Sequence, residues 1–151
     1  MEIVIILLGI AVDRFTKLWV MKSLLENSNV DIIGNFVSVL YIKNKGAAFG
    51  ILQNKLYFLT SVTIIVVVGM IYYIFKFKPQ SRMVTISLSL IISGALGNLA
   101  DRIVYGYVVD FIALHLGNIY YFPIFNIADI LVVTGTMLLA FCLLKEGKNE
   151  S

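Results

Sequence analysis

The sequence predicts an all-α membrane protein, a bundle of four transmembrane helices that carries a small extracytoplasmic β-sheet. The first observation behind this fold class is composition: hydrophobic residues make up 60% of the 151 residues and charged residues only 14%. Soluble domains usually contain about 45–50% apolar and about 25% charged residues. The second observation is that the apolar residues gather into long segments. Because one small globule cannot bury so much apolar surface, we expect lipid to cover much of it and residues 1–151 to form a single membrane domain.

Four segments approach the ~20 residues that a helix needs to cross a hydrocarbon core of about 30 Å. We expect helices at about residues 3–21, 56–75, 83–100 and 124–144. Backbone N–H and C=O groups in lipid must find partners within their own segment, which a helix provides and an open strand does not. In the third segment, the small residues around Gly94 predict close contact with a neighbouring helix.

The short loop at residues 76–82 indicates which ends of the helices face the cytoplasm. It contains three positive charges and no acidic residue, and such loops remain on the cytoplasmic side. Both termini are then expected to be cytoplasmic. The connection at residues 22–55 also carries lysines, but it is long and includes Glu26 and Asp31, so the short loop has more weight.

The two longer connections, at about residues 22–55 and 101–123, are therefore expected to be extracytoplasmic. Within the first, residues 31–43 are rich in Val, Ile, Phe and Tyr, and Gly34-Asn35 is a turn signal. This pattern predicts a small antiparallel sheet that lies on the membrane surface.

Aspartates at membrane depth are the first candidates for function, because an Asp near the bilayer centre costs about 2.5–3.5 kcal/mol. Asp13 has Lys17 at i+4 on the same helix face, and this spacing favours a buried structural pair. Asp129 is the only charge in the fourth expected helix up to residue 144, and we favour a functional role for it. Asn126 shares its face, so it either caps the helix or lines the same site.

A second polar group lies at the outer end of the third expected helix. Asn98, Asp101 and Arg102 stand at i, i+3 and i+4 and form one polar face, and Asp110 follows in an apolar stretch. Arg102 is spaced to form an ion pair with one of these acids, and the sequence does not identify which. Because the third helix ends outside and the fourth begins there, Asp101, Asp110 and Asp129 are expected to converge on the outer leaflet.

Converging carboxyls indicate acid–base chemistry. Two carboxyls in a poorly hydrated pocket cannot both ionise cheaply, so one keeps its proton at ordinary pH. The charged one can take a proton from water while the protonated one polarises a carbonyl. The single Cys142 and the single His115 exclude an internal disulfide and a Cys- or His-rich metal cluster. No serine elbow, HExxH helix or P-loop is present, and we expect neither a cofactor nor a metal.

Four separated blocks of sequence resemble the signal peptidase II family, the prolipoprotein signal peptidases. The blocks are residues 13–17 (DRFTK), 44–49 (NKGAAF), 93–102 (SGALGNLADR) with 109–112 (VDFI), and 122–129 (FPIFNIAD). The family elements that they resemble are D-x-x-x-K, N-x-G-A-A-F, G-A-x-G-N-x-x-D-R…V-D-F and F-P-x-F-N-x-A-D. Ser93 stands where glycine is common, and both residues are small.

The resemblance implies an intramembrane aspartyl protease that hydrolyses the peptide bond before the diacylglyceryl-modified lipobox cysteine and releases the signal peptide. Its substrates would be diacylglyceryl-modified prolipoproteins, cut near the outer leaflet of the bacterial cytoplasmic membrane by direct attack of water. It further implies contact with membrane lipids, none with nucleic acid, and a monomer. The catalytic acids would be Asp110 and Asp129. The residues that bind substrate or support the site would be Asn44, Asn98, Arg102, Asn126, Asp101, Asp13 and Lys17.

Two other functions are compatible with acids at membrane depth. A proton-coupled small membrane transporter also uses intramembrane acids, as proton relays. A non-enzymatic subunit of a membrane assembly would use polar residues only to hold helices together. Replacing Asp110 and Asp129 with Asn separates the three functions, since each predicts a different loss: peptidase activity, proton flux or assembly.

Overall fold

The computed structural model describes residues 1–26, 28–34, 36–47, 51–116 and 120–149. Within these ranges the helices are α1 (Glu2–Ser23), α2 (Leu56–Phe77), α3 (Arg82–Tyr105) and α4 (Ile127–Asn149). The strands are β1 (Asn29–Ile33), β2 (Val37–Asn44), β3 (Val108–Leu116) and β4 (Tyr120–Tyr121). Asn35 of the predicted turn, and Ala48 and Phe49 of the second sequence block, lie outside the described residues.

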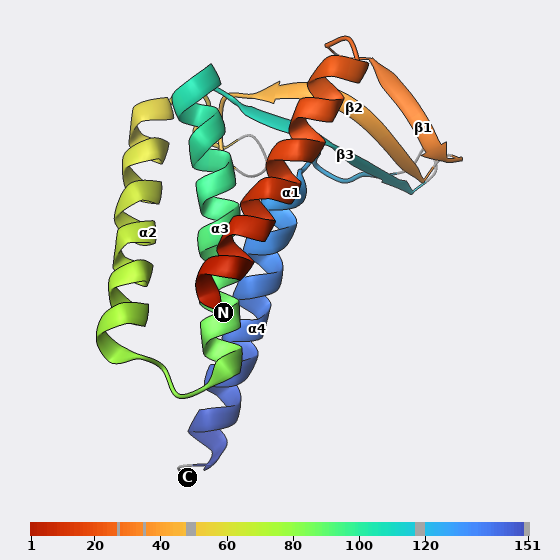
Figure 1. The fold of residues 1–151 in the computed structure, drawn as a ribbon. Coiled ribbons are helices and arrows are strands. Elements are labelled where there is room, and N and C mark those ends of the chain that lie inside the picture. Colours follow the sequence, from red (N-terminus) through yellow and green to blue (C-terminus); the bar gives the residue numbers. More distant parts are fainter. Residues whose placement is uncertain (27, 35, 48–50, 117–119, 150–151) are drawn as a thin grey trace.

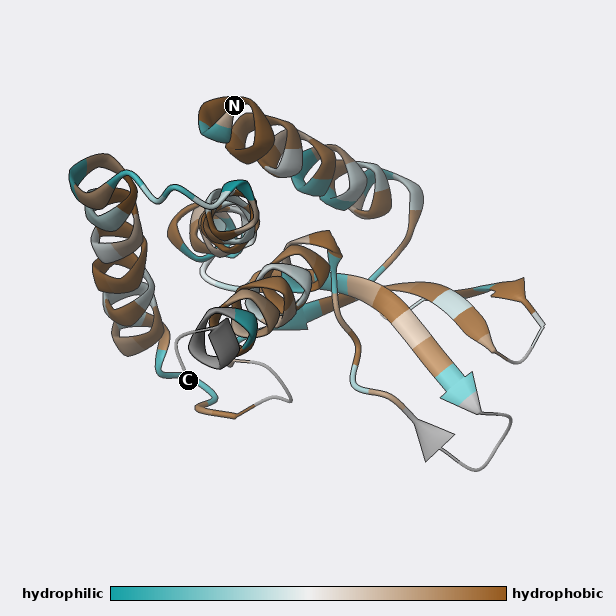
Figure 2. Ribbon diagram, turned by 90° about the horizontal axis from the view of Figure 1, so that it is seen from below, coloured by the Kyte–Doolittle hydropathy of each residue, from teal (hydrophilic) through white to brown (hydrophobic). Residues whose placement is uncertain are grey.

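Helix α3 is the centre of the bundle and packs against α1, α2 and α4 (Figures 1 and 2). Small residues on α3 permit this packing, as the sequence predicts. A Cβ added to Gly94 would lie 2.2 Å from the carbonyl oxygen of Ala128 on α4. One added to Gly97 would lie 2.6 Å from the Asp13 carboxylate on α1. The close approach of the three helices therefore depends on missing side chains.

Among the described residues, α2, α3 and residues 127–145 of α4 are long and apolar enough to cross a membrane. These three confirm part of the expected four spans. Helix α1 is as long as α2, with 22 residues. It is less apolar, because it contains the ionisable residues Glu2, Asp13, Arg14, Lys17 and Lys22. In α2 only Val67 is buried, so nearly the whole apolar surface of this helix faces outward (Figure 2).

The strands form an antiparallel sheet in the order β1-β2-β3-β4, which projects sideways from one end of the bundle (Figure 1). The predicted sheet in residues 31–43 is therefore present as β1 and β2. Strand β3 was not predicted, because its apolar run gives no alternating pattern. Val109, Asp110 and Phe111 are all buried, so both faces of β3 are covered here. Covered faces remove the alternation by which a strand is recognised.

Two helix boundaries differ from the predictions. Helix α3 continues to Tyr105 and ends at Gly106, whose φ of 77° is a left-handed conformation that suits glycine. Asp101 is therefore inside α3 and not at the start of the outer connection. Helix α4 begins at Ile127 and not at residue 124, because Asn126 caps it: the Asn126 Oδ1 atom accepts a hydrogen bond from the backbone N–H of Asp129 at 2.9 Å.

Candidate active site

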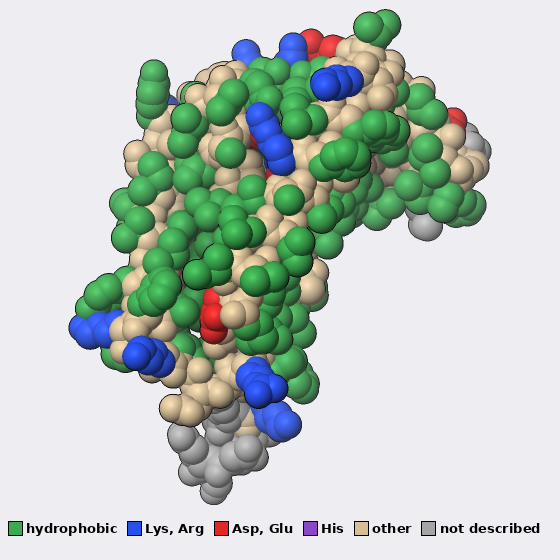
Figure 3. All heavy atoms as spheres, in the orientation of Figure 1, with side chains coloured by type: hydrophobic (Ala, Val, Ile, Leu, Met, Phe, Trp, Pro, Cys, Tyr) green, Lys and Arg blue, Asp and Glu red, His purple; other side chains and the backbone are tan. Residues whose placement is uncertain are grey.

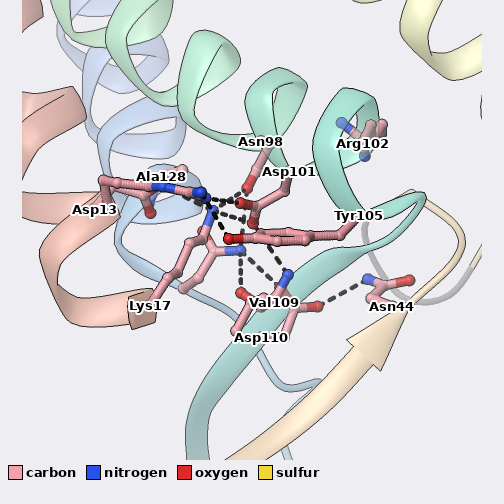
Figure 4. A network of polar contacts seen from close by, with 12 residues as sticks. Asp13, Lys17, Asn44, Asn98, Asp101, Arg102, Tyr105, Val109, Asp110 and Ala128 are labelled. Atoms are coloured by element: carbon pink, nitrogen blue, oxygen red, sulfur yellow. Dashed lines mark hydrogen bonds and ion pairs between the residues drawn. The ribbon is translucent and has the colours of Figure 1, made fainter. Parts of the chain in front are cut away.

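Polar side chains from α3, β2, β3 and the start of α4 meet at one end of the bundle. Figure 4 shows those of Asn44, Asn98 and Asp110. Asp110 of β3 is buried, with 3% of its surface exposed. The Nδ2 group of Asn44, at the end of β2, donates a hydrogen bond to Asp110 Oδ2 at 2.8 Å. The Nδ2 group of Asn126 donates to Asp110 Oδ1 at 2.6 Å. Each carboxyl oxygen of Asp110 is thus held by an amide.

Asp129 lies in the first turn of α4 and is held in a similar way. Asn98 Nδ2, from α3, donates a hydrogen bond to Asp129 Oδ1 at 2.8 Å. The backbone N–H of Asn126 donates to Asp129 Oδ2 at 3.1 Å, and the cap from Asn126 completes a reciprocal pair. Asn126 therefore contacts both acids, and both roles that the sequence left open for it, the helix cap and the site residue, are realised together.

The two acids differ in environment. Burial, and after it the nearby Asp129, raises the pKa of the Asp110 carboxyl to about 7, although the amide donors of Asn44 and Asn126 oppose the rise. Burial prevails because the amides compensate only part of the lost hydration. Asp129 is only partly buried. Near neutral pH a substantial fraction of Asp110 therefore keeps its proton.

Both acids face a cavity of about 520 Å³. Polar atoms of Asn44, Asn98 and Arg102 line it near the acids, and it continues between apolar side chains such as Val108 and Phe125. Its wall also includes residues of α2 and α4 more than one helical turn from the acids. A cavity with polar groups at one end and apolar walls beyond suits a ligand with a reactive polar part and a long apolar part.

Asp101 does not face this cavity. Its Oδ1 atom accepts from Arg14 at 3.0 Å, and its Oδ2 atom pairs with Lys17 at 2.9 Å and accepts from the backbone N–H of Val109 at 3.1 Å. The last bond holds the residue before Asp110. Asp101 therefore supports β3 from behind, whereas Asp110 and Asp129 line the cavity.

The prediction that Arg102 forms an ion pair with one of the acids is wrong. Within the described ranges Arg102 forms no ion pair, and its NH2 group donates to the carbonyl oxygen of Gly46 at 3.3 Å. In Figure 4 its side chain points away from Asp101. Arg14 takes the place at Asp101 and also donates to the Tyr105 hydroxyl at 2.7 Å. The sequence analysis assigned no role to Arg14 or Tyr105, although an arginine within an apolar helix is itself a signal.

The predicted pair of Asp13 and Lys17 is present, with Nζ 2.9 Å from Asp13 Oδ2. Asp13 Oδ1 also accepts from the backbone N–H of Ala128 at 2.9 Å. The pair thus connects α1 to the beginning of α4, the turn that carries Asp129.

Comparisons with known proteins agree along the whole chain. The sequence model described as signal peptidase (SPase) II matches residues 5–145. The "Lipoprotein signal peptidase" of Clostridium novyi (strain NT) is 56% identical over 148 residues, which cover 98% of this chain and 100% of the relative. That of Clostridium acetobutylicum is 48% identical over 151 residues, covering 99% and 98%.

Two solved structures are also similar, and both are described as bacterial membrane enzymes determined by the in meso method. One, at 2.3 Å resolution, superposes with a TM-score of 0.92 and 34% identity over 99% of this chain and 91% of that one. The other, at 1.9 Å, has a TM-score of 0.86 and 35% identity over 95% and 92%. At these identities and coverages, the likeness extends to the whole fold.

Proposed function

The chain belongs to the signal peptidase II family and has lipoprotein signal peptidase activity, and we propose that this activity is carried by Asp110 and Asp129 as an aspartic pair. The observation that supports the pair most directly is Asn126, which donates to one carboxyl from its side chain and to the other from its backbone. One residue thereby holds the two acids beside one cavity. The raised pKa of Asp110 lets this carboxyl enter the reaction with its proton, as acid–base hydrolysis requires of one of two acids.

The proposed substrate is a lipoprotein precursor whose lipobox cysteine carries diacylglycerol. Asp129, as carboxylate, takes a proton from a water molecule, whose oxygen attacks the carbonyl carbon before the cysteine. Asp110 donates its proton to the carbonyl oxygen. When the C–N bond breaks, the proton on Asp129 passes to the cysteine nitrogen and Asp110 regains its own. The products are a signal peptide with a new carboxylate and a lipidated chain with a free amine.

The other residues that line the cavity fit supporting roles. Asn44 and Asn98 fix the two carboxyls. Arg102 uses one of its donors on Gly46, and a guanidinium has five. Its remaining N–H groups are suited to hold carbonyl oxygens of the substrate or the charge that develops on the intermediate.

We further propose that α1 is the fourth span, with both termini cytoplasmic and the acids near the outer leaflet. Asp13 and Lys17 are turned inward and almost fully buried, whereas Phe15 and Trp19 are exposed on the outer side of α1. From the end that carries the sheet, α1 runs back toward its N-terminal residue, α4 runs away along the bundle, and the loop between α2 and α3 lies at the far end of these two helices (Figure 1). On the face in Figure 3, Lys and Arg side chains gather mostly at the two ends. This distribution fits an apolar band between two aqueous surfaces.

The test is cleavage of a diacylglyceryl-modified precursor peptide by the purified full chain in lipid. Asp110→Asn and Asp129→Asn are each expected to lower kcat by about 10³-fold or more, since each acid takes part in bond cleavage. Asp31→Asn is the matched control, because Asp31 lies on exposed β1, away from the cavity, and its carboxylate accepts a hydrogen bond from Ser38, which the amide oxygen of asparagine can also accept. Cleavage within about tenfold of the parent rate by either site variant would refute the aspartic pair.

A further inference from the structure

A cluster of four charged side chains lies behind the acid pair, between α1 and α3 (Figure 4). Asp13, Lys17 and Asp101 are at most 1% exposed. Arg14 closes the cluster on the outer side, where its side chain is 33% exposed. Two cations and two anions make the cluster neutral, which allows it to be buried. The two cations are not equivalent, because they contact different neutral groups.

Each N–H donor of the Lys17 ammonium group has an acceptor. Its ammonium group carries three N–H donors. Three acceptors stand at 2.9 Å from Nζ: Asp13 Oδ2, Asp101 Oδ2 and Asn98 Oδ1. Two of the bonds neutralise its charge. The third goes to the amide that holds Asp129.

This third bond decides how the Asn98 amide is oriented. An asparagine amide has an acceptor on one side and donors on the other. With Lys17 on the Oδ1 side, the Nδ2 group must turn toward Asp129, to which it donates at 2.8 Å. Asn126 Nδ2 also faces Asn98 Oδ1, at 3.2 Å. However, its two hydrogens are shared among three acceptors, of which Asp110 Oδ1 is much the shortest at 2.6 Å.

We propose that Lys17 is a positioning residue of the reaction, which fixes the Asn98 amide so that its N–H group, and not its carbonyl, faces Asp129. The proposal rests on the proposed role of Asp129 as the base that activates water. Without the Lys17 bond the amide can turn over, and its carbonyl oxygen would then repel the Asp129 carboxylate. A carboxylate that loses a donor takes up a proton at higher pH, so the base would be lost at pH values at which the parent still works.

The charged groups that face Asp129 come from three elements. Asp110 is on β3 and Arg102 on α3, and both interact with it electrostatically. Helix α1 contributes Lys17 through Asn98. Arg14 contacts Asp101 and Tyr105 but not Asn98. Removing Arg14 therefore takes one positive charge from the same cluster, as removing Lys17 does, but leaves the orientation of the Asn98 amide intact.

The experiment compares Lys17→Met with Arg14→Met in the purified full chain, with the lipidated precursor peptide as substrate. For Lys17→Met we expect kcat to fall about ten- to a hundredfold, the loss of one hydrogen bond to a charged group, with KM within about twofold. The acid limb of kcat against pH should move up by about one unit. For Arg14→Met, kcat should stay within about threefold and the limb should not move, although both variants unfold at lower temperature.

Because both variants leave an uncompensated buried charge, each is repeated with Asp13→Asn, which restores neutrality and keeps an acceptor for Ala128. The kcat loss and the pH shift should persist only in the pair that contains Lys17→Met. Equal losses in the two pairs, or an unmoved acid limb with Lys17→Met, would overturn the positioning role. Failure of the aspartic pair has a separate signature, which is cleavage by Asp110→Asn or Asp129→Asn.

Discussion

The buried Asp110 carboxyl is expected to limit the stability of this protein in a way that depends on pH. Its pKa rises from the ordinary 3.8 to about 7, chiefly through burial. A folded state with a raised carboxyl pKa binds its proton more tightly than the denatured chain does. The contribution of Asp110 to stability is therefore greatest below about pH 4, declines as pH rises toward about 7, and stays constant at higher pH. Asp110→Asn removes the charge and with it this dependence.

The change in unfolding free energy for Asp110→Asn follows from the pKa shift of Asp110 and from the two amides that donate to its carboxyl. A rise of about three pKa units corresponds to about 4 kcal/mol. The substituted amide offers one oxygen where Asn44 and Asn126 now find two, so one buried hydrogen bond worth about 1 kcal/mol is lost. We expect a net gain of about 3 kcal/mol for Asp110→Asn at pH 8 and a net loss of about 1 kcal/mol at pH 4.

The assay is thermal unfolding in detergent at pH 4 and pH 8, followed by a thiol-reactive dye. Cys142 is the single cysteine of the chain and is buried, so it reacts when the fold opens. The melting temperature of Asp110→Asn should exceed that of the parent by several degrees at pH 8 and fall below it at pH 4. The melting temperature of Asp31→Asn, a change on the exposed β1 strand, should differ little from that of the parent at either pH. A loss of equal size at both pH values would refute the argument.

Two further predictions concern the residues around the acids. Activity should fall as pH rises through about 7, where Asp110 loses its proton, and Asn44→Leu should move this alkaline limb up by about one unit by removing a donor to the charged form. The pH profile of kcat/KM checks this shift, with the exposed Asn29→Leu expected to leave the limb in place. Gly94→Ala should cost about 1–3 kcal/mol, because its Cβ would meet the α4 backbone at 2.2 Å. Gly69→Ala on α2, where nothing lies within 4 Å, should be neutral or stabilising in the same thermal assay.

What the sequence predicts correctly is local in the chain. The pair of Asp13 and Lys17 follows from i,i+4 spacing on one helix, and the structure contains it. The partner of Asp101 could not be predicted in this way, because Arg14 is 87 residues away. Arg102 is adjacent in sequence to Asp101 and therefore looked like part of the same polar group. At successive positions on a helix, however, two side chains point about 100° apart, so Asp101 faces α1 while Arg102 lines the cavity.

Asn126 also shows where reasoning from spacing stops. Its position before α4 predicts a cap, and its spacing from Asp129 predicts a shared face, but neither predicts its contact with Asp110 on β3. That contact requires β3, a strand that a uniformly apolar run does not reveal. The four sequence blocks meet only when α1, β2, α3, β3 and α4 are assembled, so the resemblance connects residues that local patterns leave apart.

The acid pair and the charged cluster behind it differ in how their charges are compensated, and this difference fits their proposed functions. In the cluster, Lys17 and Asp101 each have partners of opposite charge at 2.9–3.0 Å. At the acid pair, the hydrogen-bond donors to Asp110 within the described part of the chain are neutral amides, so its pKa remains high. A cation there would stabilise the fold and would also remove the proton that the reaction needs. Neutral asparagines contact the acids directly, and Lys17 contacts Asn98 instead of the acids. This arrangement orients the site without ionising Asp110.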